Sequence, residues 1–146
     1  IVECSAPAEL KLGRFLPHTP IRVLIDQNKQ DLSDAISHQS MAETADKFDK
    51  DQIVSFLNSQ KEHINQMIKV AETRADQQMQ QLIALSNKEM LASLSAEIKR
   101  LVRLKKINPS IKEQEIEQLK DMTLLAHENI KQAQLRLDAI RFVITS

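Results

Sequence analysis

The feature that most constrains the fold is a long stretch without helix breakers. Between Ile21 and Asn108 the chain contains neither glycine nor proline. Glycine and proline are the residues that most often mark turns and the ends of helices. We therefore expect most of the chain to be helical, with strands confined to the residues before this stretch and to its first few positions.

A turn near Asn108 divides the helical part into two antiparallel helices. Pro109 lacks a backbone N–H and disfavours a helical conformation at Asn108, so the first helix should end near Lys106. Ser110 and Glu113 have the spacing of a capping box, which predicts that the second helix starts at Ser110. The sequence thus predicts a helical hairpin.

The two helices are predicted over residues 49–106 and 110–142. Apolar residues of the first recur about every 3.7 residues, which is nearer to an eleven-residue repeat than to a heptad. The second carries a heptad stripe, with alternating spacings of three and four. Because the two periods differ, the first half of the long helix should pack on a sheet or bend near Ser86-Asn87. The heptad stripe consists of Ile116, Leu119, Thr123, Ala126, Ile130, Ala133, Leu137, Ile140 and Ile144.

The N-terminal part, residues 1–30, is predicted to be rich in strands. Ile1–Cys4 and Ile21–Ile25 have the apolar, β-branched character of strands. Ala8–Leu12 fits either a helical turn or a short strand. Two strands make a marginal sheet, and an unpaired edge there could recruit another chain, so we expect weak self-association.

Residues 31–48 are predicted to form short helical pieces, with a break over Ser37–Ser40 and a further turn of helix over Ala42–Phe48. The predicted fold class is therefore α+β: a small, mainly antiparallel sheet at the N-terminal end plus a long antiparallel helical hairpin of coiled-coil type. We expect residues 1–146 to form a single domain. Because the chain begins with Ile1 rather than Met, we expect it to be a piece of a longer protein.

Composition excludes several classes of protein. Lysine plus arginine and aspartate plus glutamate each number 20, which argues against a globally basic nucleic-acid binder. A single cysteine, Cys4, excludes an internal disulfide and is typical of a reducing compartment. No apolar run approaches the roughly 20 residues of a membrane span, and no secretory leader is visible. We therefore expect a cytoplasmic location and no membrane partner.

No residue pattern indicates catalysis. The single glycine, Gly13, excludes a glycine-rich phosphate loop within these residues. The four histidines lack metal-ligand spacing with one another or with Cys4, and no nucleophile elbow is present. We predict no catalytic residue, no cofactor and no metal ion. The four histidines are His18, His38, His63 and His127.

One basic cluster lies around the predicted turn. Its cations would complement the dipole at the C-terminus of the first helix, which is the interpretation we favour. The alternative is a tip that contacts the phosphates of RNA or DNA, or another partner. Glu113, Glu115 and Glu117 follow closely and would weaken a phosphate site. The cluster consists of Lys99, Arg100, Arg103, Lys105, Lys106 and Lys112.

Two motifs carry a family resemblance. The turn Ile107–Glu113 followed by Gln134–Arg141, and the earlier segments Leu10–Pro17 and Thr19–Asp26, occur in the order and at the separation seen in one family. The chain resembles the C-terminal domain of the RapA family of bacterial RNA polymerase-associated ATPases, of the Swi2/Snf2 class.

The resemblance implies a parent protein that hydrolyses ATP, translocates on nucleic acid and recycles RNA polymerase in transcription. It also implies a mainly antiparallel sheet surrounded by helices, with the two longest helices in a coiled-coil arrangement. The family's helicase motifs have no counterpart in these residues, so no catalytic residue can be transferred.

We therefore expect a non-catalytic C-terminal module that supports the ATPase lobes of its parent or contacts RNA polymerase. Nucleic acid would be bound through the parent. Two alternatives stay open: a nucleic-acid-binding hairpin with a basic tip, and a coiled-coil adaptor that dimerises. Salt-dependent binding to single strands would favour the first alternative, and a concentration-dependent size would favour the second.

Overall fold

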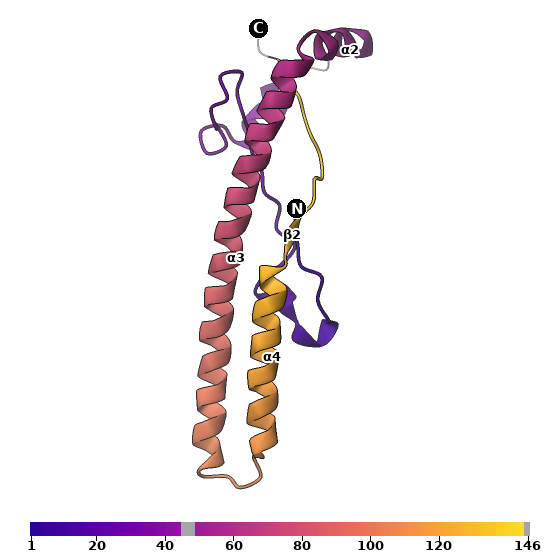
Figure 1. Cartoon of the computed structure of the whole chain (residues 1–146). Helices are drawn as coiled ribbons and strands as arrows, with labels where there is room; N and C mark the ends of the chain where they lie inside the picture. The colour runs from indigo at the N-terminus through magenta and orange to yellow at the C-terminus, as the bar shows by residue number, and fades with distance from the viewer. Residues whose placement is uncertain (45–48, 145–146) are drawn as a thin grey trace. The chain divides into compact units, whose positions relative to one another are not determined.

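The computed structural model describes residues 1–44 and 49–144. It confirms the α+β class, with a two-stranded antiparallel sheet and a long helical hairpin (Figure 1). In chain order, the elements are β1 (Val2–Glu3), the 3-10 helices η1 (Ala8–Leu10) and η2 (Leu12–Arg14), α1 (His38–Thr44), α2 (Lys50–Ser59), α3 (Lys61–Lys105), α4 (Glu113–Lys131) and β2 (Gln134–Leu135).

The chain divides into two compact units. Unit 1 consists of Ile1–Pro20 and Met79–Arg136, and unit 2 consists of Ile21–Gln78 and Leu137–Ser146. Helix α3 contributes residues to both. The interpretation of residues 1–146 as a single domain stays a prediction.

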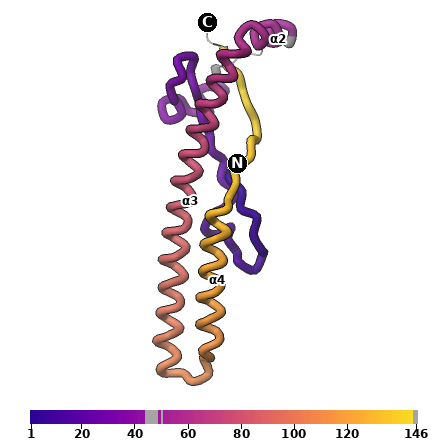
Figure 2. The backbone as a smooth tube through the Cα atoms, in the orientation of Figure 1, coloured from indigo at the N-terminus to yellow at the C-terminus, as the bar shows by residue number. Residues whose placement is uncertain are grey.

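The hairpin of unit 1 is formed by α4 and the part of α3 from Met79 onward, which lie side by side (Figure 2). His127 Nδ1 lies 2.9 Å from Asn87 Oδ1, and Lys105 forms an ion pair with Glu113. The later residue of α3 is thus paired with the earlier residue of α4, which confirms the predicted antiparallel arrangement. Coiled-coil packing of the two helices stays a prediction.

The buried apolar residues of the described chain all belong to unit 1. They come from α3, from α4 with the residues after it, and from the N-terminal segment Ile1–Pro20. The core of unit 1 is therefore formed by both helices and this segment. Burying aliphatic side chains in this way is the main stabilising contribution to such a unit. These residues are Val2, Leu10, Leu12, Leu16, Ile83, Met90, Ile116, Ala126, Ile130 and Ala133.

The second helix is shorter than the predicted 110–142. Helix α4 ends at Lys131, and the chain then pairs as β2 with β1, in the register Val2↔Leu135 and Glu3↔Gln134. The last four residues of the predicted heptad stripe, from Ala133 onward, therefore lie outside the helix, and Leu137 is 72% exposed. The prediction was wrong because pairing with a strand from the other end of the chain overrides the helical period, which is a local signal.

The start of α4 also differs from the prediction. The helix begins at Glu113 rather than at Ser110, with Lys112 as the N-cap residue. The backbone N–H of Lys112 donates to Glu115 Oε1 at 3.4 Å, whereas Ser110 donates its N–H to Asn108 Oδ1 at 3.0 Å. Ser110 therefore belongs to the turn, where its N–H is bonded to Asn108, and the helix starts three residues later than predicted.

An unpaired edge was predicted at Ile1–Cys4 or at Ile21–Ile25, and for the first of these strands the structure contradicts it. One side of β1 pairs with β2, and on the other side Val2 donates its N–H to Thr19 O at 2.9 Å. The predicted strand Ile21–Ile25 is not found as a strand, since Ile25 forms only an isolated bridge with Asp31. Weak self-association of the chain stays a prediction, but β1 does not offer an unpaired edge for it.

The predicted helix over 49–106 is interrupted once. Helix α2 ends at Ser59, whose hydroxyl donates to Phe56 O at 2.8 Å, and α3 begins at Lys61 after a turn at Gln60. A hydroxyl bonded back to a carbonyl of the preceding turn competes with the helical ladder. Helix α3 continues through Ser86-Asn87, and the bend predicted there stays a prediction.

Residues before α2 contain a short helix, as predicted, but its position differs. Helix α1 begins at His38, inside the predicted break Ser37–Ser40, and Ser40 donates its N–H to Ser37 Oγ at 3.1 Å. Of the turn predicted over Ala42–Phe48, residues 45–48 lie outside the described residues. The helical alternative for Ala8–Leu12 is confirmed by η1.

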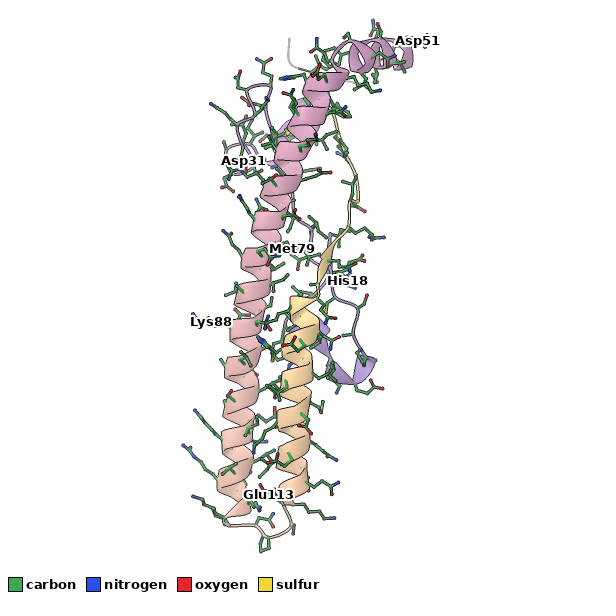
Figure 3. The ribbon with its side chains drawn as sticks, viewed as in Figure 1. His18, Asp31, Asp51, Met79, Lys88 and Glu113 are labelled. Carbon is green, nitrogen blue, oxygen red and sulfur yellow. The ribbon has the colours of Figure 1, made fainter. Side chains whose placement is uncertain are left out.

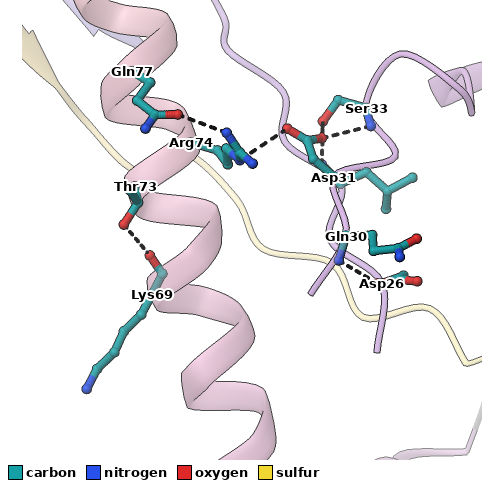
Figure 4. A network of polar contacts seen from close by, with 9 residues as sticks. Asp26, Gln30, Asp31, Ser33, Lys69, Thr73, Arg74 and Gln77 are labelled. Atoms are coloured by element: carbon teal, nitrogen blue, oxygen red, sulfur yellow. Dashed lines mark hydrogen bonds and ion pairs between the residues drawn. The ribbon is translucent and has the colours of Figure 1, made fainter. Parts of the chain in front are cut away.

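Unit 2 contains a polar loop around Asp31. The Asp31 carboxylate accepts hydrogen bonds from the Ser33 hydroxyl at 2.5 Å and the Ser33 N–H at 3.0 Å. The Arg74 guanidinium of α3 lies 4.0 Å from the same carboxylate (Figure 4). The side-chain hydrogen bond from Ser33 lowers the pKa of Asp31, and the Ser33 N–H and the charge of Arg74 lower it further.

This loop should therefore be sensitive to acid. A carboxyl whose pKa is lowered on folding stabilises the loop above its ordinary pKa and loses that contribution as the pH falls through the folded value. Carbon-detected NMR titration should show a lowered pKa for Asp31. Ser33→Ala should raise that pKa more than Arg74→Gln, because the hydrogen bonds from Ser33 are the larger cause. Equal shifts in the two variants would contradict this assignment.

Candidate functional site

The six predicted basic residues gather at one end of the hairpin. Four lie in the last two turns of α3, Lys106 follows in the turn, and Lys112 precedes α4. Glu113, labelled in Figure 3, marks the same end. Lys105 is half-buried and the other five are exposed. The structure therefore brings the predicted cluster together in space.

The three glutamates expected to weaken a phosphate site are already engaged. Glu113 forms the ion pair with Lys105, and Glu115 accepts the N–H of Lys112. Glu117 Oε1 lies 2.7 Å from Lys120 Nζ. Each carboxylate thus has a partner, which for Glu113 is on α3 and for Glu115 and Glu117 is on or next to α4. The reason for favouring the dipole interpretation is correspondingly weaker.

Four cations of the cluster have no such partner. Within residues 1–44 and 49–144, the side chains of Lys99, Arg100, Arg103 and Lys106 make no ion pair or hydrogen bond. Lys99, Arg103 and Lys106 are spaced by four and three residues, which places them along one face of the helix end. In Figure 3, nitrogen-tipped side chains project from this end of α3 away from α4.

The turn that joins the helices is well ordered by backbone hydrogen bonds. The N–H groups of Ile107 and Asn108 both donate to Leu104 O, at 3.0 and 2.8 Å. Lys106 donates its N–H to Arg103 O at 3.2 Å. These bonds cap the last carbonyls of α3 and fix the direction in which the turn residues point.

Ile107 is the residue at this end that sequence reasoning missed. Its side chain is 84% exposed, more than that of any other large apolar residue in the described chain. A signal was present, since an aliphatic residue directly before Asn108-Pro109 cannot continue a helical stripe. The hairpin end therefore combines unpaired cations with an exposed aliphatic side chain.

Three of the histidines and the cysteine have contacts of their own away from the basic cluster. His127 bonds to Asn87 inside the hairpin, His18 Nδ1 is 3.9 Å from Glu3, and His38 Nε2 is 3.4 Å from Arg141. Cys4 Sγ donates to Asn129 O at 3.1 Å, and burial raises the pKa of the thiol. In the described ranges no three His, Cys, Asp or Glu residues are grouped so that they could hold a metal ion.

None of the helices that the structure describes combines the length and apolar character needed to cross a bilayer. The features of the hairpin end are those of a contact surface, with charge and one apolar side chain but no arrangement of a nucleophile with a base.

Comparisons with known proteins converge on one family. The model of a family described as "RNA polymerase recycling family C-terminal" matches residues 1–145. The RNA polymerase-associated proteins RapA of Yersinia pestis (strain Pestoides F) and of Yersinia pseudotuberculosis serotype O:1b (strain IP 31758) are each 36% identical over 146 residues. The match covers 100% of this chain and 15% of each relative. The chain thus spans about a seventh of the length of these relatives.

Proposed function

Since the chain belongs to the RNA polymerase recycling family as its C-terminal domain, we propose that it is a non-catalytic module of a RapA-like transcription regulator. The parent is an ATP-dependent enzyme of the Swi2/Snf2 class that recycles RNA polymerase in the cytoplasm. The observation that carries this proposal is the family match over residues 1–145. No residue of this chain is assigned to the ATPase reaction.

Two roles fit such a module. It supports the ATPase lobes of the parent, or it contacts RNA polymerase. The exposed end of the hairpin favours contact, because four cations and Ile107 have no partner within the described residues. A purely supporting role would require the remainder of the parent to cover that end.

Nucleic-acid binding by the hairpin end is the second candidate. It is favoured by the same four cations, whose charge the neighbouring glutamates do not compensate. Lysine and arginine that neutralise phosphates release counterions, so binding of this kind weakens steeply as salt rises. A dimerising adaptor is the third candidate, and a concentration-dependent size would favour it.

The proposal predicts that the 146-residue chain alone hydrolyses no ATP, with or without DNA. The physical reason is that its single glycine leaves no phosphate loop. Turnover above a buffer blank, in a preparation free of contaminating ATPase, would contradict the non-catalytic role.

The same chain, immobilised as bait, should retain purified core RNA polymerase if it acts by contact. A surface carrying the chain after thermal unfolding serves as the control. Absence of retention would leave support of the ATPase lobes as the role.

A further inference from the structure

The end of the hairpin presents a defined surface, which we call the tip surface: Lys99, Arg103, Lys106 and Ile107. The three cations are exposed, lie along one face and form no ion pair within the described part of the chain. Between Ile98 and Asn108 the sequence contains no acidic residue. The tip surface therefore carries positive charge over a stretch of the chain that contains no carboxylate of its own.

Ile107 stands at the end of this charged face. Its backbone N–H donates to Leu104 O, and the next residue bonds to the same carbonyl, so the side chain is held on an ordered turn. The ion pair between Lys105 and Glu113 joins the two helices directly beneath the turn. A preorganised apolar side chain loses little conformational freedom when it enters a pocket, and this favours binding.

The chemistry of the tip surface favours a protein partner over a nucleic acid. Bases are bound by stacking on aromatic or planar side chains, and the chain has no Trp or Tyr and no Phe between residues 57 and 141. The Arg103 guanidinium is planar and can stack, but the isoleucine at the end of this face is not flat. An aliphatic side chain next to Lys and Arg instead matches an apolar pocket with carboxylates at its rim.

We propose that the tip surface docks on an acidic face of core RNA polymerase, where Ile107 fills an apolar pocket and Arg103 and Lys106 pair with carboxylates at its rim. This inference rests on the proposed function and names the part of the module that makes the contact. Arginine beside a buried apolar anchor is a frequent composition of the energetically dominant part of an interface. Lys99 lies farther from the turn and contributes mainly to the rate of association.

The test measures binding of the full-length protein to purified core RNA polymerase at several salt concentrations. Ile107→Asp should weaken binding by about tenfold or more, as loss of a central anchor does. Arg103→Glu with Lys106→Glu should weaken it by a similar factor and reduce its dependence on salt. Ile107→Ser is a milder second variant that adds no charge and should lie between wild type and Ile107→Asp.

Two matched controls separate the tip surface from general effects of charge and polarity. Lys88→Glu reverses an exposed cation of the same helix, far from the turn. Leu124→Asp changes an apolar residue of α4 that is 66% exposed. Both should bind within about twofold of wild type, since exposed substitutions away from an interface have small effects. Equal thermal unfolding of all variants verifies that they are folded.

A parallel titration with labelled single-stranded RNA and duplex DNA tests whether the tip surface binds nucleic acid instead. If Ile107→Asp binds polymerase like wild type while the double reversal loses RNA or DNA, the tip surface binds nucleic acid and the inference is overturned. If wild type and all tip variants bind polymerase equally, the inference fails and the proposed function stands. If wild type does not bind polymerase, both polymerase contact and the inference are wrong.

Discussion

Replacing Ile130 with alanine should lower the free energy of unfolding of unit 1 by about 2–5 kcal/mol. The Ile130 side chain is 0% exposed and lies near the end of α4, next to the residue whose carbonyl accepts the Cys4 thiol. Truncation removes apolar contact and leaves a cavity between the helix and the N-terminal segment. Denaturant unfolding followed by circular dichroism measures the change.

Leu124→Ala on the same helix is the control for this prediction. Its side chain is 66% exposed, so the substitution should change the free energy of unfolding by less than about 0.5 kcal/mol. Leu137→Ala should be similarly mild, although the heptad stripe predicts burial of Leu137. A loss at Leu137 as large as that at Ile130 would contradict the end of α4 at Lys131.

His127→Ala should cost about 1–3 kcal/mol, because it leaves the amide of Asn87 without its partner. Asn87 is only 7% exposed, and its Oδ1 lies 2.9 Å from His127 Nδ1 across the two helices. Water cannot readily replace the lost partner at so buried a position. Thermal or denaturant unfolding of the single variant measures the cost.

A double-mutant cycle isolates this pair. Asn87→Leu combined with His127→Leu should cost less than the sum of the two single variants, with a coupling of about 0.5–3 kcal/mol. His18→Ala provides the control, since that imidazole is exposed and 3.9 Å from its nearest carboxylate. Additive costs at Asn87 and His127 would show that the hydrogen bond contributes nothing to stability.

The predictable part of the fold depends on local signals. The Asn108-Pro109 turn ends α3 at Lys105, one residue from the predicted position. The heptad positions from Ile116 to Ala133 are buried or half-buried, as is every position of the stripe predicted for the long helix. That stripe consists of Ile53, Leu57, Ile64, Ile68, Ala71, Ala75, Met79, Leu82, Ser86, Met90, Leu94, Ile98 and Leu101. Helical periodicity and proline chemistry act over a few residues, so one sequence contains them in full.

The incorrect predictions of the helix ends have two causes. Either a distant part of the chain pairs with the segment, or a neighbouring side chain forms a hydrogen bond that the predicted cap would have used. The end of α4 depends on β1, more than a hundred residues away, and no pattern around Lys131 announces it. Ser110 has good capping chemistry, but the Asn108 side chain accepts its N–H first. At the hairpin end, the sequence located the basic cluster. The engagement of Glu113 and the exposure of Ile107 require the geometry of the turn.

The pairing of β1 with β2 also determines when unit 1 can be completed during synthesis. Its first segment leaves the ribosome before Ile21–Gln78, and its last strand follows only after the whole hairpin has been translated. At bacterial-type elongation rates this delay is on the order of ten seconds. During this delay Val2, which is fully buried in the folded protein, lacks its partner strand. Contacts between residues so far apart in the sequence also form slowly, because a long loop has to close first. The nascent segment is therefore exposed to chaperones and proteases until the arrival of Gln134-Leu135 protects it.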